Sequence, residues 1–174
     1  MQGTGQAAYE CVYEGEDENG QQGVRLSKDI VKVAGKCMEK NFTMLGPQVL
    51  PWSEQALVVL SIVGRYLQKR MSVKQPMKPY VPDFKTAIDH FCIHAGGRAV
   101  IDGIEKNLKL EPFHTEASRM TLNDYGNTSS SSIWYELEYI QEKQKSSQLR
   151  KGDRILQVAF GSGFKCTSGV WLKL

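Results

Sequence analysis

The segment His90–Arg98 constrains the fold of this chain more than any other stretch. It places a short apolar run directly before a glycine pair, Gly96-Gly97. In a strand, alternate side chains share a face, so we expect His90, Cys92 and His94 to point the same way. The glycines then end the strand and open a helix. This pattern predicts an α/β domain with His94 at the carboxyl end of a strand, where α/β proteins place their chemistry.

The other predicted elements surround this strand in an alternating order. We expect a hairpin over residues 9–26, helices over 27–38, 53–70, 98–108, 116–125 and 132–145, and strands over 154–160 and 165–172. Gly46-Pro47 and Pro51 are expected to bracket a loop, and residues 74–83, with three prolines, to form a surface connection. The order predicts one layered α/β domain.

Composition excludes several classes of function. The 174 residues carry a net charge of +3 without an arginine-rich run, so we expect no nucleic-acid partner. The four cysteines show no C-x-x-C spacing and no signal peptide precedes them, which indicates reduced thiols. The longest mainly apolar run, Ala56–Val63, is far shorter than the roughly 20 residues that span a bilayer. We therefore expect no transmembrane or signal segment in this chain.

Three pieces of sequence could each have a catalytic role, although each could also have a purely structural one. His94 ends its strand before a glycine break. Gly126-Asn127-Thr128 fits a helix end and a turn, yet the Asn127 amide also suits a fixed hydrogen-bond donor to an oxyanion. The loop Gly161-Ser162-Gly163 fits a tight turn, and its backbone N–H groups could also approach a substrate closely.

Two other functions for the side chains of the histidine strand are disfavoured. A zinc site made by His90, Cys92 and His94 would need three ligands from one strand, where residues on the same face lie about 7 Å apart. We therefore expect no metal site. Cys92 as a nucleophile activated by His94 is chemically allowed, but the two side chains share a face without converging.

Several long strings are spread over the chain: Leu26–Asp29, Leu45–Pro47, Leu50-Pro51 with Ser53–Gln55, Tyr80–Lys85, His90–Val100, Gly126–Leu137 and Gly161–Cys166. Together these strings resemble one family, the plant very-long-chain 3-ketoacyl-CoA synthases, which are the condensing enzymes of fatty acid elongation. The similarity covers residues 9–174 and corresponds to the C-terminal half of such an enzyme. Residues 1–8 do not resemble the family and form an unmatched N-terminal segment.

The resemblance implies a thiolase-like layered α/β fold, of which this chain is the C-terminal half only. It implies a condensation of acyl-CoA with malonyl-CoA, with decarboxylation, at a Cys-His-Asn triad. His94 and Asn127 match the triad histidine and asparagine, Gly161, Ser162 and Gly163 match the oxyanion loop, and His90 is a neighbouring supporting residue. The substrates are CoA thioesters, and no further cofactor is implied. Other elongase subunits, a dimer and the endoplasmic reticulum membrane are implied in the same way.

The triad cysteine of that family lies in its other half, and no cysteine of this chain has an equivalent context. The isolated chain is therefore expected to be inactive. The competing hypothesis is a truncated, non-catalytic fragment, or a partner that docks on an intact synthase. Such a half would expose a large apolar face.

Overall fold

The structure, a computed structural model, describes residues 6–71, 77–145, 147–161 and 164–174. Its helices are α1 (Gln6–Glu10), α2 (Ile30–Val49), α3 (Trp52–Arg70), α4 (Arg98–Leu108), α5 (Glu116–Tyr125) and α6 (Ser132–Glu142), with short 3-10 turns η1 (Phe84–Thr86), η2 (Pro112–His114) and η3 (Ser129–Ser131). Its strands are β1 (Val12–Glu16), β2 (Gln22–Leu26), β3 (His90–Ile93), β4 (Arg154–Gly161) and β5 (Lys165–Leu172). The predicted mixture of helices and strands is confirmed.

The central sheet has the strand order β3-β4-β5 among the described residues. β3 pairs in parallel with β4, and β4 pairs antiparallel with β5. A parallel pair needs a long crossover, and here the segment from α4 to α6 supplies it. The carboxyl ends of β3 and β4 therefore lie side by side, which places the residues after these strands close together.

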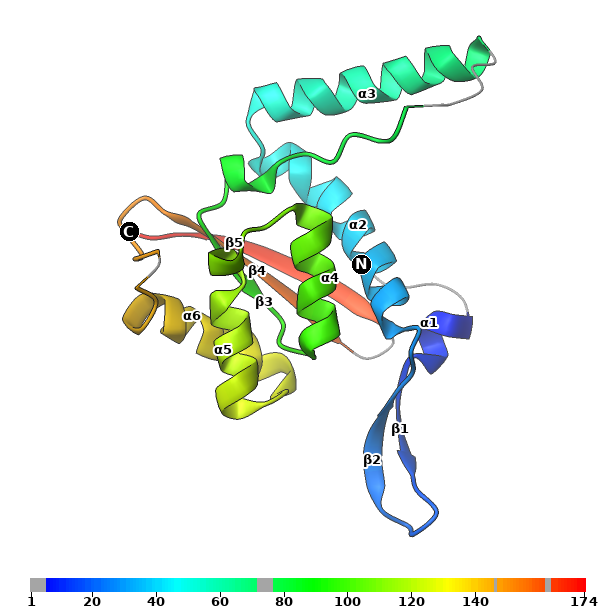
Figure 1. Ribbon diagram of the computed structural model, residues 1–174, viewed down its shortest axis with the longest axis vertical. Coiled ribbons are helices and arrows are strands. Elements are labelled where there is room, and N and C mark those ends of the chain that lie inside the picture. The colour runs from blue at the N-terminus through cyan, green and yellow to red at the C-terminus, as the bar shows by residue number, and fades with distance from the viewer. Residues whose placement is uncertain (1–5, 72–76, 146, 162–163) are drawn as a thin grey trace.

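Helices cover both faces of the sheet, and the period of two along β3 decides which side chains meet which helices. Phe91 and Ile93 lie in the larger hydrophobic cluster with residues of α2 and α4. Cys92 lies in the smaller cluster with Ala117 of α5 and Ile140 of α6. The expected alternation along the histidine strand is confirmed, and the domain has three layers (Figure 1).

Two parts of the chain extend away from these layers (Figure 1). The hairpin of β1 and β2 is confirmed, although its first strand begins at Val12 because Tyr9 belongs to α1. Every residue of β2 is exposed. At the opposite end, α3 projects beyond the sheet and is followed by residues 77–83, which form no regular element, as predicted; residues 72–76 lie outside the described part.

Glycines fix the bounds of two helices. α4 begins after Gly97, whose φ of 155° favours glycine, and α5 ends at Gly126 with φ 70°. Both helices have the bounds that the sequence predicts. α6 ends at Glu142, three residues before the predicted end.

The expected loop at Gly46-Pro47 is wrong, because α2 continues through both residues to Val49. A proline ring normally clashes with the Cβ of the preceding residue in a helix, and Gly46 has no Cβ. The Leu50 N–H also bonds to the Gly46 carbonyl at 2.9 Å, which closes the last turn after the proline. The start is shifted too, since Ser27 accepts the Asp29 N–H one turn before the helix begins at Ile30.

Candidate active site

His94 follows β3 directly and is only 8% exposed. Its backbone N–H extends the parallel ladder by bonding to the Val158 carbonyl of β4 at 2.9 Å. The ring nitrogen Nδ1 lies 3.1 Å from the Ser132 hydroxyl. Burial lowers the pKa of His94, and an interaction with the Ser129 backbone opposes this effect only in part. His94 is therefore a fixed, neutral imidazole at pH 7.

Asn127 meets the loop after His94 at Gly96. Its amide nitrogen donates to the Gly96 carbonyl at 3.2 Å, and its amide oxygen accepts the Ser129 N–H at 2.9 Å. Asn127 is exposed to solvent. An amide NH₂ has two hydrogens, so one remains for a substrate oxygen.

Gly96 also brings Asn127 and His94 together. A Cβ built on Gly96 would lie 3.0 Å from Cδ2 and 3.2 Å from Nε2 of the His94 ring. The backbone of Gly96 thus lies directly against the imidazole on one side and accepts the Asn127 amide at its carbonyl. The two predicted residues, 33 positions apart in the sequence, share one glycine as a neighbour.

The turn between α5 and α6 is shaped by unusual backbone angles. Ser129 has φ 57°, a left-handed conformation that costs a non-glycine residue about 1 kcal/mol. The Ser132 hydroxyl donates to the Ser129 carbonyl at 2.9 Å, and the Asn127 oxygen holds the Ser129 N–H. These bonds stabilise the turn and orient Asn127 toward Gly96.

The predicted glycine loop begins beside the same residues. Phe160 and Gly161 end β4, and the Phe160 ring meets the His94 ring edge-on with centroids 6.2 Å apart. Ser162 and Gly163 lie outside the described residues. The carboxyl ends of β3 and β4 and the α5–α6 turn therefore converge on His94.

A buried chain of polar groups behind His94 was not predicted from the sequence. The Ser118 hydroxyl of α5 accepts the Ile93 N–H at 3.1 Å and donates to Glu136 of α6 at 2.8 Å. Glu136 has no exposed surface, and its other oxygen, Oε1, has no hydrogen-bond partner among the described residues. The sequence signal was the spacing of four between Ser132, Glu136 and Ile140, which places two polar residues on the buried face of α6.

Burial raises the pKa of Glu136 to about 8, although the Ser118 hydroxyl and the Ile93 and Ala95 N–H groups lower it. Between pH 4.5 and about 8 the folded protein keeps this proton while the unfolded chain loses it, so stability falls as the pH rises. We expect Glu136→Gln to remove this decrease in the free energy of unfolding, which amounts to roughly 2–5 kcal/mol over that pH range. Urea unfolding at pH 5 and pH 8 measures the free energy of unfolding at both ends of the range.

Glu138→Gln is the matched control, because Glu138 is exposed on the same helix. It should leave the pH dependence of unfolding as it is in the parent chain. If the free energy of unfolding of Glu136→Gln depended on pH as it does in the parent chain, Glu136 would be ionised in the folded state, and its raised pKa would be wrong.

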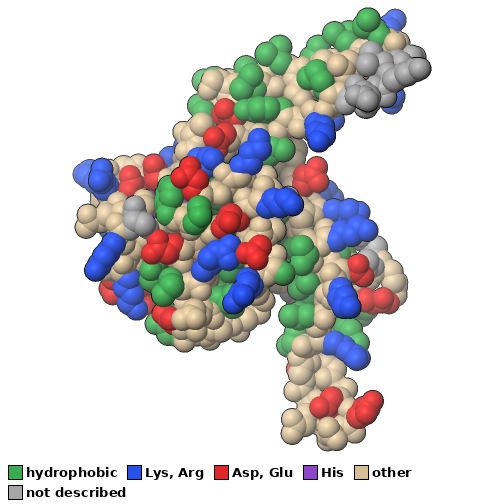
Figure 2. All heavy atoms as spheres, in the orientation of Figure 1, with side chains coloured by type: hydrophobic (Ala, Val, Ile, Leu, Met, Phe, Trp, Pro, Cys, Tyr) green, Lys and Arg blue, Asp and Glu red, His purple; other side chains and the backbone are tan. Residues whose placement is uncertain are grey.

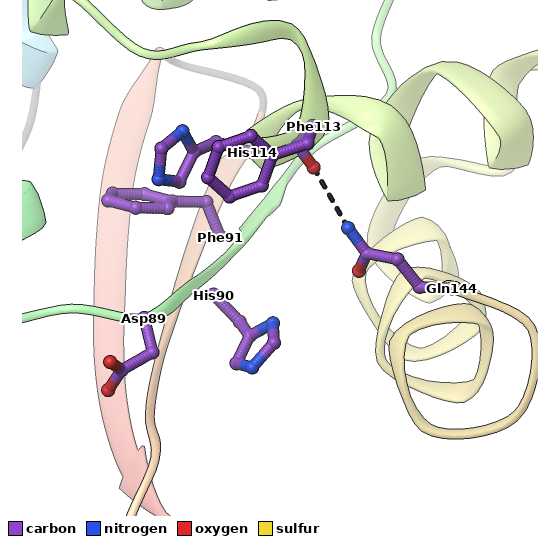
Figure 3. A pocket seen from close by; sticks show the side chains of 6 residues that line it. All are labelled: Asp89, His90, Phe91, Phe113, His114 and Gln144. Carbon is purple, nitrogen blue, oxygen red and sulfur yellow. Dashed lines mark hydrogen bonds between the residues drawn. The ribbon is translucent and has the colours of Figure 1, made fainter. Parts of the chain in front are cut away.

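His90 lies at the other end of β3, roughly 13 Å from His94 at the rise of a strand. Its Nε2 lies 3.1 Å from the Asp153 carboxylate, which also accepts the Arg150 N–H. The hollow beside it, drawn in Figure 3, is too narrow to admit a water molecule. Phe91 packs edge-on against His114 there, and Gln144 donates to the Phe113 carbonyl. These contacts join elements of the fold and do not reach His94.

None of the four cysteines is presented as a nucleophile. All four are buried. Burial raises the pKa of Cys11, raises that of Cys166 to about 12, and together with the nearby Glu136 raises that of Cys92 well above its usual value. A thiolate is the reactive form, so Cys92 does not act as a nucleophile activated by His94.

The described part of the chain contains no cluster of His, Cys, Asp and Glu able to hold a metal ion. Within the same residues, no helix has both the length and the apolar character needed to cross a membrane.

Two family profiles match the sequence. Residues 1–67 match "FAE1/Type III polyketide synthase-like protein", and residues 78–173 match "Chalcone and stilbene synthases, C-terminal domain". Among curated proteins, 3-ketoacyl-CoA synthase 9 and 3-ketoacyl-CoA synthase 17 of Arabidopsis thaliana are each 56% identical over 172 residues, which is 99% of this chain. The alignment covers 32% and 34% of these relatives, so the chain spans about a third of their length.

Solved structures show the same fold at low sequence identity. A fungal type III polyketide synthase, ORAS, superimposes with a TM-score of 0.64 at 18% identity, over 99% of this chain and 39% of that one. The structure of CsyB complexed with CoA-SH gives a TM-score of 0.60 at 21% identity, over 100% and 39%. The expected thiolase-like α/β fold class and the resemblance to 3-ketoacyl-CoA synthases are confirmed.

Proposed function

Because the chain belongs to the family of chalcone and stilbene synthase C-terminal domains, we propose that it supplies the histidine and asparagine of a 3-ketoacyl-CoA synthase site. The observation that supports this most is the convergence of His94 and Asn127 on Gly96. The names of the Arabidopsis relatives support the same reaction class. The whole enzyme would lengthen very-long-chain acyl groups with malonyl units.

The proposed reaction has two stages. An acyl-CoA first transfers its acyl group to a cysteine thiolate outside this chain and releases CoA. Malonyl-CoA then loses CO₂, and the electron pair of the broken bond moves into the thioester as an enolate. The enolate carbon attacks the acyl carbonyl, the cysteine leaves as a thiolate, and the product is a 3-ketoacyl-CoA. The reaction needs no reactant besides these two CoA thioesters and no further cofactor.

His94 and Asn127 act where charge develops in this scheme. Decarboxylation places negative charge on the thioester oxygen, and fixed donors beside that oxygen stabilise the transition state by several kcal/mol. The contacts of His94 with Ser132 and of Asn127 with Ser129 hold both side chains in place in advance, and His94 donates from Nε2 when the Ser132 hydroxyl is turned toward Nδ1. The Gly161–Gly163 loop is proposed to donate backbone N–H groups to the acyl oxygen, and His90 to support the histidine strand.

From the same family resemblance we propose that the whole enzyme resides in the endoplasmic reticulum membrane, works with other elongase subunits and forms a dimer.

A chimera tests the proposal directly. The segment of Arabidopsis thaliana 3-ketoacyl-CoA synthase 9 that aligns with this chain is replaced by the 174 residues, and 3-ketoacyl-CoA formation is measured in membranes. We expect condensation at a rate within about tenfold of the parent enzyme, since 56% of the aligned residues are identical. A correctly expressed chimera that forms no product would contradict the proposal.

A non-catalytic fragment or docking partner is the second candidate, and the burial of all four thiols favours it for the chain by itself. We expect the purified 174-residue chain to form no 3-ketoacyl-CoA from acyl-CoA and malonyl-CoA, because none of its thiols can carry the acyl group. Mass spectrometry should find no acylated cysteine. Product formation by the purified chain would show that one of these cysteines reacts.

A further inference from the structure

Helix α3 is amphipathic with its polar face turned inward. Glu54, Ser61 and Gln68 recur every seven residues, which is about two helical turns, and so lie on one side. Glu54 and Ser61 are the two buried residues of this helix. A helix that joins a protein core shows the reverse pattern, with its apolar face buried.

The inward polar face is satisfied by the chain itself. Ser61 accepts the Tyr80 N–H at 3.0 Å, and Glu54 accepts both the Tyr80 hydroxyl and the Asp83 N–H at 2.8 Å. Gln68 accepts the Met77 N–H at 2.7 Å. Residues 77–83 therefore cover this side of α3 and bond to Glu54, Ser61 and Gln68.

The opposite face of α3 is apolar and uncovered. Its large side chains have exposed fractions between 48% for Val63 and 84% for Trp52. These side chains are Trp52, Val59, Leu60, Ile62, Val63, Tyr66 and Leu67. α3 packs extensively on no other helix or strand of the described chain. Figure 2 shows the hydrophobic side chains along the projecting end of the molecule. An apolar surface of this size indicates an interaction site.

Charge and aromatic residues point to the kind of partner. The only acidic residue of α3, Glu54, is buried, while Arg65, Lys69 and Arg70 lie in its second half. Lys78 follows on the covering segment and is exposed. Basic residues beside an apolar helical face that carries Trp and Tyr favour the headgroup region of an anionic membrane.

We propose that the outer face of α3 inserts into the surface of a membrane with anionic lipids. Trp52, Val59, Val63 and Tyr66 enter the boundary between headgroups and acyl chains. Lys69 and Arg70 contact lipid phosphates near the end of the helix. This surface is independent of His94 and of the proposed activity, so each can fail without the other.

Vesicle flotation with the 174-residue chain tests the proposal. We expect the chain to float with phosphatidylcholine vesicles that contain phosphatidylserine, and less with phosphatidylcholine alone or at high salt. The double variant Val59→Glu, Val63→Glu should lower the apparent affinity at least about tenfold, because it places two charges in the apolar face. The pair Lys69→Ala, Arg70→Ala should remove the preference for phosphatidylserine.

The matched control is Val31→Glu with Met44→Glu, which places the same charges on exposed positions of α2. It should bind as the parent chain does. Equal binding of the Val59→Glu, Val63→Glu variant and the parent chain would overturn the proposal. A second result would also overturn it: the parent chain forms a dimer without lipid, as measured by analytical ultracentrifugation, the Val59→Glu, Val63→Glu variant is a monomer, and the parent chain does not bind vesicles. The outer face of α3 would then bind a second copy of the chain.

A reactivity measurement separates the membrane from protein that could cover α3 in a longer chain. In membranes of the chimeric synthase, Leu60→Cys should react slowly with a water-soluble maleimide and quickly with a lipid-soluble one. Slow reaction with both reagents would mean that protein covers this face and would overturn the proposal.

Discussion

His94→Ala or Asn127→Ala in the chimeric synthase is expected to lower the rate of malonyl-CoA decarboxylation by about 10³-fold, the effect of removing one fixed donor from a developing oxyanion. The fold should survive both changes. The described polar and ring contacts of His94, with Ser132, Ser129 and Phe160, lie within the site, and the Asn127 side chain is exposed. The rate of ¹⁴CO₂ release from labelled malonyl-CoA measures the chemical step separately from acyl transfer.

The double variant should be little slower than either single variant, because two donors that act on one oxygen are not additive. Asn107→Ala is the control, since it removes an exposed amide from α4 without touching the site. If either single variant decarboxylated malonyl-CoA at the parent rate, that residue would lose its proposed role.

Gly96→Ala is expected to lower the same rate by about tenfold, although neither donor is removed. The new methyl group would lie 3.0 Å from Cδ2 of His94, which is tighter than most Cβ contacts, so the ring must shift by a few tenths of an ångström. A 1 Å displacement costs about 10²-fold in a site that depends on orientation, and this smaller shift should cost less. The kcat of the chimera should fall while its melting temperature changes little.

Gly35→Ala in α2 is the matched control, because a Cβ at Gly35 meets no atom within 4 Å. It should leave kcat unchanged and stabilise the helix by roughly 0.5–1 kcal/mol. Parent-like activity of Gly96→Ala would show that the His94 ring has room to move without loss of function.

Local sequence patterns predicted most of the fold. The strand, the glycine pair and the helix after it give β3 and α4, and Gly126 gives the end of α5, because each boundary depends on one residue with a restricted backbone conformation. The continuation of α2 through Pro47 could not be predicted from proline alone. It depends on a glycine before the proline and on the burial of Gly46 in the domain.

The site needed more than local pattern. His94 was a candidate from its place at a strand end, but its pairing with Asn127 came from the family resemblance, since nothing local links residues 33 positions apart. Glu136 was missed because a glutamate at helical spacing is normally exposed, and only the packing of α5 and α6 against β3 buries it.

The Ser132 hydroxyl has a single proton, and this limits which nitrogen of His94 can donate. While that proton bonds to the Ser129 carbonyl, Ser132 can only accept from His94, so the neutral ring carries its hydrogen on Nδ1 and leaves Nε2 as a lone pair. A rotation of the hydroxyl toward Nδ1 reverses the tautomer and gives an N–H on Nε2, the atom beside Gly96. One serine rotamer can thus switch His94 from proton acceptor to hydrogen-bond donor without any change of net charge in a buried site.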